Sequence, residues 1–206
     1  TQIPTVEIYG TTLVNLLGSY GNFEVDSNSD GLADGWIQLG SPALSLDNTY
    51  KLFVTHSQKV VPNTGGAGIV SVFETTLDHV YFVSVYVYGD GEIRLRNVSG
   101  GTVLYSEEFS TTSWERISKK QTATSSYKLH LVGTTGEIAY YDGAMFIDLT
   151  ASGALDPVRQ AKYGVANWED LTKAQLEAEI PYFDSVLSVN VKDGTASELT
   201  VENRGK

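Results

Sequence analysis

The stretch YFVSVYVYGDGEIRLRN, residues 81–97, carries the clearest strand pattern in this sequence of 206 residues. Successive side chains of a strand point to opposite faces, so the alternation separates aliphatic residues from aromatic and polar ones. One face carries Tyr81, Val83, Val85 and Val87, and the other carries Phe82, Ser84, Tyr86 and Tyr88. Gly89-Asp90-Gly91 then predicts a short turn and residues 92–97 a partner strand, so we expect a β-hairpin whose aliphatic face belongs to the core.

The other face of this hairpin is a candidate ligand-binding surface. Aromatic rings stack on the C–H-rich faces of sugars, and a guanidinium offers hydroxyl groups a fixed fork of donors. The candidate residues are Phe82, Tyr86, Tyr88, Arg94 and Arg96. The alternative is that the C-terminal part of the chain, or another subunit, covers this face, and the sequence leaves both interpretations open.

Short apolar segments separated by Gly, Pro, Asn and Ser clusters continue on both sides of this stretch. We expect strands at 6–8, 13–17, 36–39, 50–56, 68–74, 103–109, 114–120, 127–132 and 137–148. Strands spaced about ten residues apart are typical of an all-β sandwich. From Asp156 the pattern changes, and Thr172 to Gln175 forms a capping box that predicts a helix over 173–180, ended by Pro181.

These patterns predict three parts: a lead-in strand (1–12), a β-sandwich (13–150) and a helix-containing extension (151–206) that leads to a next module. A sandwich of this length is a common single domain. The chain begins at Thr1 without Met, so we expect a processed piece or fragment of a longer protein.

Composition excludes several classes of function. The net charge of −11, from 25 acidic and 14 basic residues, argues against a nucleic-acid partner. The absence of Cys excludes disulfides, thiolate metal sites and a Cys nucleophile. No apolar run approaches the roughly 20 residues that cross a bilayer, so we expect no membrane insertion.

A loop rich in Asp and Asn has the spacing of a calcium site. Asp26, Asn28, Asp30 and Asp34 occupy positions 1, 3, 5 and 9, with Gly31 at position 6. Hard cations take six to eight oxygen ligands, which such a loop can direct to one ion. Position 12 is Ile37, so this is not an EF-hand. The alternative is a hydrated loop stabilised by Asx-turns.

Catalytic patterns are weak. None of the three histidines, His56, His79 and His130, lies in a nucleophile motif. A glycosidase needs two carboxylates across a cleft, and the candidates Glu107, Glu108 and Glu137 show no pattern beyond charges at strand edges. We therefore expect no enzyme activity. Of the tryptophans, Trp36 and Trp114 are predicted in the sandwich core, and Trp168 between the sandwich and the extension.

Four short motifs together resemble a known family. They are Asn15-Leu16-Leu17, residues 21–24 (GNFE), residues 34–36 (DGW) and residues 140–145 (YYDGAM). They resemble the carbohydrate-binding jelly-roll modules of the CBM4/9/22 type over residues 13–150. The resemblance implies a two-sheet antiparallel jelly-roll sandwich, non-catalytic carbohydrate binding and a structural calcium near Glu24 and Asp142. Gly143 stands where many relatives have a second Asp.

The remainder of the chain resembles the segment that follows such modules in tail and fibre proteins of phages infecting Gram-positive bacteria. That resemblance implies an extracellular or virion location, a glycan of the bacterial cell wall or capsule as partner, and a homo-oligomer within a longer fibre. One alternative is a structural or oligomerising fibre domain without sugar binding. The other is a glycan depolymerase.

Overall fold

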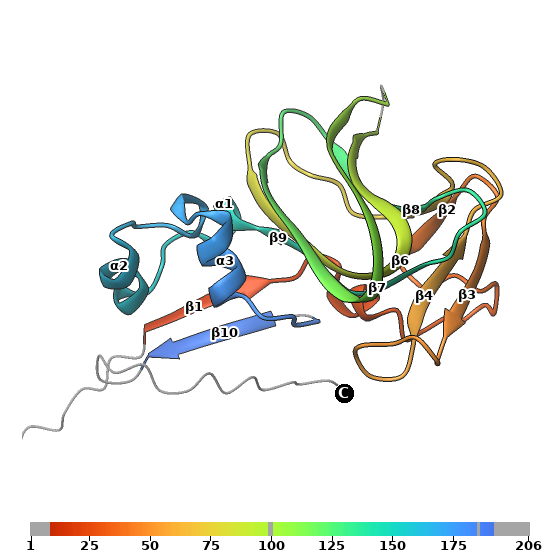
Figure 1. Ribbon diagram of the computed structural model, residues 1–206. Coiled ribbons are helices and arrows are strands. Elements are labelled where there is room, and N and C mark those ends of the chain that lie inside the picture. Colours follow the sequence, from red (N-terminus) through yellow and green to blue (C-terminus); the bar gives the residue numbers. More distant parts are fainter. Residues whose placement is uncertain (1–8, 99–100, 185, 192–206) are drawn as a thin grey trace, which may run out of the picture.

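The computed structural model describes residues 9–98, 101–184 and 186–191, and it shows an all-β jelly-roll-like sandwich with a helix-containing C-terminal segment (Figure 1). One curled antiparallel sheet has the order β2-β5-β8-β6-β9-β4-β3, and β7 pairs with the other edge of β6. The sheet strands are β2 (Trp36–Leu39), β3 (Ala43–Asp47), β4 (Ser57–Val61), β5 (Gly68–Ser71), β6 (Val80–Asn97), β7 (Val103–Thr122), β8 (Tyr127–Gly133) and β9 (Ala139–Asp148). The predicted fold class is confirmed.

The predicted hairpin within residues 81–97 is wrong, because β6 is one strand of 18 residues that runs through Gly89-Asp90-Gly91. The first half of β6 pairs with β9, the second half pairs with β8, and β7 follows the opposite edge. Gly89 has φ +89°, and a Cβ there would lie 2.1 Å from the carbonyl oxygen of Ile138. The register shifts between Val87 and Gly89. The glycines therefore mark a bend with a bulge and not a reversal of the chain.

The strands predicted at 103–109 and 114–120 are likewise one strand, β7, of 20 residues. The strand predicted at 50–56 is a loop between β3 and β4. Carboxylate side chains bind the main-chain N–H groups of this loop, as described below, so these groups do not join a strand ladder. β3 has no counterpart among the predicted strands.

The bend in β6 places the two ends of the sheet in separate layers that enclose one core. The layer of β9, β4 and β3 faces the layer of β8, β5 and β2, and the Tyr141 hydroxyl of β9 donates a hydrogen bond to the Val132 carbonyl of β8 at 2.6 Å. The predicted aliphatic face of β6 is buried, as expected. Core side chains include Val83, Val85, Val87, Ile93, Leu95, Ile69, Leu129, Leu131, Tyr141 and Phe146.

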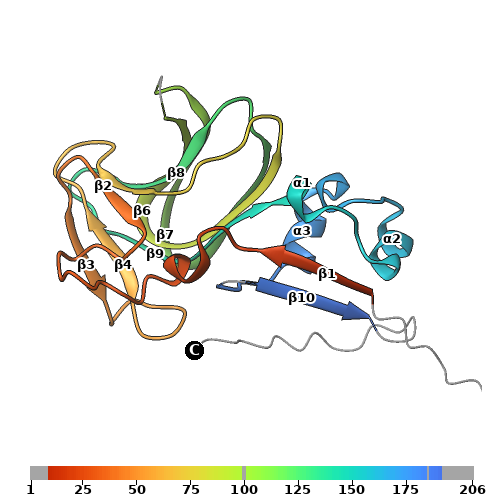
Figure 2. The same ribbon diagram turned by 180° about the vertical axis from the view of Figure 1, so that it is seen from behind.

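The chain enters and leaves this structure side by side. Strand β1 (Tyr9–Val14) pairs antiparallel with β10 (Val186–Val191), and Tyr9 lies opposite Val191. Helices α1 (Leu149–Ser152), α2 (Pro157–Tyr163) and α3 (Lys173–Glu179), with the 3-10 turns η1 (Gly18–Asn22) and η2 (Trp168–Asp170), complete the elements. Figure 2 shows from behind that α1, α2 and α3 lie along one side of the β1–β10 pair. The predicted strand 6–8 and residues 192–206 of the extension lie outside the described residues.

The predicted capping box opens α3. Thr172 Oγ1 accepts a hydrogen bond from the Gln175 N–H at 3.3 Å, and Gln175 Oε1 accepts one from the Thr172 N–H at 2.8 Å. The helix ends at Glu179, before Pro181. None of the helices in the described ranges is both long and apolar enough to cross a bilayer.

A second apolar cluster joins the extension to the sandwich. Phe82, Met145 and Ile147 of the sheet pack with residues of the helical segment that include Trp168, Leu176 and Ile180. Trp168 is completely buried at this junction, as predicted, and the Arg159 guanidinium lies 5.7 Å from its ring. Arg159 also forms an ion pair with Asp156, the N-cap of α2, at 2.8 Å, and one with Glu179 at 2.7 Å that ties α2 to α3.

We expect Phe82→Ala to lower the free energy of unfolding by about 3–5 kcal/mol, because it removes a completely buried ring and leaves a cavity at this junction. Leu77→Ala is the control, since Leu77 is 56% exposed and its loss should change stability by about 0.5 kcal/mol or less. Urea denaturation measures both. Equal stabilities for the two variants would show that the junction is not packed as described.

Candidate functional site

The outer face of the β9-β4-β3 layer carries the predicted tyrosines, but the extension divides this face into two halves. Phe82, Ser84, Tyr86 and Tyr88 project from β6 on this side. Register places Met145 beside Ser84 and Tyr140 beside Tyr88. The helical segment packs on the half near Phe82, so the covered-face interpretation holds for that half, and ligand binding by the other half stays a prediction.

In the covered half, Phe82 is completely buried beneath the extension, so its predicted role in ligand binding is wrong. Arg116 of β7 closes this half. Its guanidinium donates to Ser84 Oγ at 2.6 Å and to the Ile180 carbonyl oxygen at 2.8 Å. Burial lowers the pKa of Arg116. Tyr86 lies at the boundary, half-buried, with its ring edge-on to Phe53 at 5.1 Å between ring centroids.

In the open half, four rings form the aromatic cluster: Tyr50, Tyr88, Trp114 and Tyr140. Ring centroids are 4.9 Å apart for Tyr50 and Tyr88, 4.8 Å for Tyr50 and Tyr140, and 6.0 Å for Tyr88 and Trp114. Tyr50 is 40% exposed, and Tyr88 and Trp114 are half-buried. The Lys59 ammonium lies 5.8 Å from the Tyr140 ring. The cluster therefore offers exposed ring surface beside one cation.

The prediction that Trp114 fills the core is wrong, because Trp114 lies on this outer surface beside Tyr88. Trp36 is buried and stacks on Phe23 at 5.2 Å, as predicted. Sequence reasoning missed Tyr50, Trp114 and Tyr140 as members of the cluster. Alternation along β9 could have placed Tyr140 on the face of Asp142, but its pairing with Tyr88 depends on a register that the sequence does not reveal.

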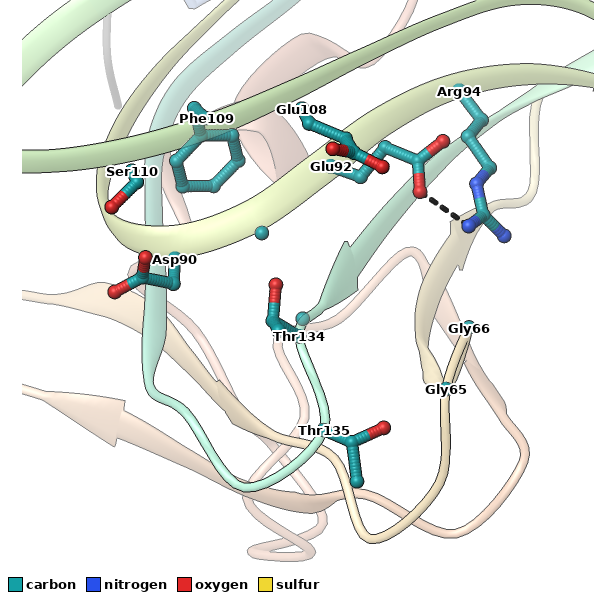
Figure 3. A pocket seen from close by; sticks show the side chains of 12 residues that line it. Gly65, Gly66, Asp90, Glu92, Arg94, Glu108, Phe109, Ser110, Thr134 and Thr135 are labelled. Carbon is teal, nitrogen blue, oxygen red and sulfur yellow. Dashed lines mark hydrogen bonds and ion pairs between the residues drawn. The ribbon is translucent and has the colours of Figure 1, made fainter.

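Arg94 and Arg96 lie beyond the bend, on the layer of β8, β5 and β2. Arg94 forms an ion pair with Glu92 and lines a cavity of about 590 Å³ (Figure 3). The Arg96 Nε donates to the Gly101 carbonyl oxygen at 3.1 Å. His130 of β8 lies opposite Arg94. Burial, with the nearby arginines and Lys128, lowers the pKa of His130 to about 4, so this imidazole is neutral at pH 7.

The loop predicted to bind calcium is held by Asx-type hydrogen bonds. The Asp26 carboxylate accepts from the Gly31 N–H at 2.9 Å, Asp30 from the Leu32 N–H at 2.9 Å, and Asp34 from the Ser27 N–H at 3.1 Å. The Asn28 side-chain oxygen accepts from the Asp30 N–H at 3.3 Å. Within residues 9–98, 101–184 and 186–191, no three or more His, Cys, Asp or Glu side chains gather as a metal site. Calcium binding by this loop stays a prediction.

Glu24 and Asp142 meet at the loop between β3 and β4. The Asp142 carboxylate is completely buried and accepts from the Leu52 N–H at 2.9 Å and the Phe53 N–H at 2.8 Å. The Glu24 carboxylate accepts from the Thr55 N–H at 2.8 Å and the His56 N–H at 3.0 Å. Burial raises the pKa of Asp142 to about 6, and the negative charge of Glu24 adds to the rise. A bound cation would balance the negative charge that Glu24 places near the Asp142 carboxyl group.

Gly143, which stands where the modules that the sequence resembles often have a second Asp, has a steric reason to be glycine. Its φ is +56°, and a Cβ there would lie 2.4 Å from the Phe53 ring. A second Asp at this position would displace Phe53. This position therefore supplies no carboxylate to a cation, and any further oxygen ligands beside Glu24 and Asp142 must come from elsewhere.

Comparison with known proteins supports the fold assignment. No protein-family model and no curated protein matches the sequence. Among solved structures, the arabinose-bound α-L-arabinofuranosidase MgGH51 is similar, with 14% identity, a TM-score of 0.52, and coverage of 68% of this chain and 27% of that enzyme. This chain thus spans about a quarter of the enzyme. At this identity the likeness shows the fold alone.

Two carbohydrate-binding modules are also similar, at lower TM-scores. The C-terminal family 22 carbohydrate binding module of Clostridium thermocellum Xyn10B has 16% identity and a TM-score of 0.48, over 65% of this chain and 96% of that module. The Family 16 Carbohydrate Binding Module-2 has 15% identity and a TM-score of 0.45, over 62% of this chain and all of that module (100%).

We expect Asp142→Asn to alter the pH dependence of stability. Because the pKa of Asp142 is about 6 in the folded protein and about 3.9 in an unfolded chain, the folded state binds the proton more tightly. As pH rises from about 4 to about 6, the contribution of this carboxyl group to the free energy of unfolding therefore falls, by at most about 3 kcal/mol.

Urea titrations of both proteins in chelator, across this pH range, measure the effect. The parent should lose stability relative to Asp142→Asn as pH rises. A stability difference that stays constant across this range would contradict the raised pKa.

Proposed function

We propose that this chain is a non-catalytic carbohydrate-binding module and that the aromatic cluster contacts the sugar. The observation that carries the proposal is the open half of the outer face, where Tyr50, Tyr88 and Trp114 expose ring surface beside Lys59. Ring faces bind the C–H-rich faces of pyranoses, and neighbouring polar groups orient the hydroxyls. The motif resemblance to CBM4/9/22 modules supports the same class of function.

The proposed ligand is a glycan of a bacterial cell wall or capsule, and the proposed setting is a phage tail or fibre protein, hence extracellular or in the virion. This setting rests on the motif resemblance of the extension. A shallow surface buries few ligand atoms, so single-site dissociation constants in the micromolar to millimolar range are expected, about −4 to −8 kcal/mol. Several copies in one fibre would raise the effective affinity.

A structural fibre domain is the second candidate, and one observation favours it. The extension buries Phe82, and its Ile180 and Glu177 accept hydrogen bonds from Arg116 and Ser118, respectively. Half of the face therefore serves packing. A domain of this kind would keep the same fold and bind no glycan.

We expect the double variant Tyr88→Ala/Trp114→Ala to lose glycan binding, because it removes two of the rings while leaving the core intact. Native affinity gels containing a panel of soluble bacterial and plant polysaccharides measure retardation, and circular dichroism checks the fold. Tyr105→Ala is the control, because Tyr105 is a half-buried tyrosine of β7 that is not part of the cluster.

A folded double variant that is retarded as strongly as the parent would place the sugar elsewhere. A parent that no polysaccharide retards would favour the structural candidate. Retardation of the parent and of Tyr105→Ala, but not of the double variant, is the result that the proposal requires.

We also propose that a calcium ion stabilises the fold through Glu24 and Asp142, with the loop from Asp26 to Asp34 as a second candidate. A ligand that binds only the folded state adds about 2.7 kcal/mol at a hundredfold excess over its dissociation constant. The melting temperature should therefore fall by several degrees in chelator, and elemental analysis should find calcium.

Two variants separate the candidate calcium sites. Asp142→Asn should remove the response to chelator if Glu24 and Asp142 hold the ion, whereas Asp30→Asn should remove it if the loop does. A melting curve that chelator leaves unchanged, with no calcium in the purified protein, would contradict both assignments.

A further inference from the structure

The cavity beside the bend of β6 is separate from the aromatic cluster and has different chemistry. Three segments enclose it: the bend of β6 with the facing part of β7, the turn at Gly65 and Gly66, and the turn at Thr134 and Thr135 (Figure 3). Its volume of about 590 Å³ lies within the usual range for small-ligand sites. On β6, Tyr88 before the bend belongs to the aromatic cluster, whereas Glu92 and Arg94 after the bend line this cavity.

The cavity is open to solvent, and most of its polar side chains are exposed, so a ligand can reach them. Among the described residues, no hydrogen bond or ion pair occupies the side chains of Asp90, Glu108, Ser110, Thr134 and Thr135. Glu92 is the exception, because it accepts from Arg94 and from Ser106. Two carboxylates and three hydroxyls can therefore serve a ligand that has many hydroxyl or amino groups.

One aromatic ring and several glycines shape the cavity for a ring-sized ligand. Phe109 forms part of the wall, held edge-on to Tyr141 at 5.7 Å. A Cβ at Gly91 would lie 2.7 Å from the Phe109 ring, so only glycine allows β6 to pass this close. Gly65 and Gly66 contribute no side chain to the opposite side, where Thr135 and Arg94 are their neighbours (Figure 3).

The charge of the cavity selects the ligand class. Asp90, Glu92 and Glu108 oppose the single Arg94, which leaves two negative charges in excess. Glu92 and Glu108 lie directly opposite each other on β6 and β7, an arrangement that normally destabilises a strand pair. Arg94 forms an ion pair with Glu92 and also attracts Glu108 electrostatically, so one guanidinium faces two carboxylates, and Asp90 has no ion-pair partner in the described part of the chain. A cationic group on the ligand would relieve this repulsion.

We propose that this cavity binds a sugar residue that carries a protonated amine, such as a hexosamine without its N-acetyl group. Asp90 and Glu108 hold the ammonium group, and Ser110, Thr134 and Thr135 bind ring hydroxyls. This site is distinct from the aromatic cluster and does not require it. N-acetylation removes the charge, and a uronic acid reverses it, so both bind worse.

Isothermal titration of the full chain with glucosamine hexamer, N-acetylglucosamine hexamer and oligogalacturonate tests the proposal. At about pH 6 an amine with a pKa near that of an α-amino group is protonated. We expect the glucosamine hexamer to bind at least about tenfold more tightly than the other two. The preference should shrink as salt rises from about 50 mM to about 500 mM, since salt screens the charges.

Variants locate the site. Glu108→Gln and Asp90→Asn should each weaken glucosamine binding at least about tenfold, whereas the control Leu77→Ala, at an exposed position outside the cavity, should leave it unchanged. Equal binding of the acetylated and free hexamers, no binding of either, or unchanged binding in both carboxylate variants would overturn the proposal. Loss in Trp114→Ala alone would assign the hexamer to the aromatic cluster and would also overturn it.

Thermal unfolding gives a second readout. Because Glu108 faces Glu92 across the strand pair, Glu108→Gln should melt at the same or a higher temperature than the parent without ligand. The stabilisation that the glucosamine hexamer gives the parent should disappear in this variant. A variant that melts lower without ligand would show that Glu108 serves the fold, and this result would contradict a carboxylate kept for binding.

Discussion

The bend of β6 at Gly89-Asp90-Gly91 is the constraint on which the other features of this structure depend. This one strand runs through both layers, because its first half pairs with β9, its second half pairs with β8, and β7 pairs along its other side. Gly89 and Gly91 permit the bend. A Cβ at Gly89 would lie 2.1 Å from the Ile138 carbonyl oxygen, and a Cβ at Gly91 would lie 2.6 Å from the Tyr141 hydroxyl. Tyr88, just before the bend, belongs to the aromatic cluster, whereas Asp90 in the bend and Glu92 and Arg94 after it line the polar cavity.

The extension is the second determinant of the exposed surface, because it decides how much of the outer face stays open. Its apolar residues bury Phe82. The Ile180 carbonyl oxygen accepts a hydrogen bond from Arg116, and the Glu177 carboxylate accepts one from Ser118. The loop between β3 and β4 limits the open half from the other side and brings Tyr50 onto Tyr88. Asp142 and Glu24 hold that loop through its N–H groups, so a cation bound there would also position Tyr50.

Local patterns in the sequence were sufficient for the strand type, the buried face of Val83, Val85 and Val87, the cap at Thr172 and the junction role of Trp168. They failed where contacts between residues distant in sequence determine the structure. A Gly-Asp-Gly segment fits a hairpin turn and a bulge equally well, and only the pairing with β8 and β9 selects the bulge. The position of Tyr140 beside Tyr88 depends on a register that joins strands about fifty residues apart in sequence. Loop 50–56 alternates like a strand, but the carboxylates that bind its N–H groups lie far along the chain.

The three tryptophans allow the central claim, sugar contact at the aromatic cluster, to be measured directly. Each indole N–H gives a separate proton–nitrogen NMR signal, and the environments differ: Trp168 is completely buried, Trp36 donates to the Tyr20 carbonyl oxygen at 2.9 Å, and Trp114 lies in the cluster. Titration with a polysaccharide that retards the protein in affinity gels should shift the Trp114 signal and leave the other two in place. Binding that leaves the Trp114 signal unmoved would contradict this account.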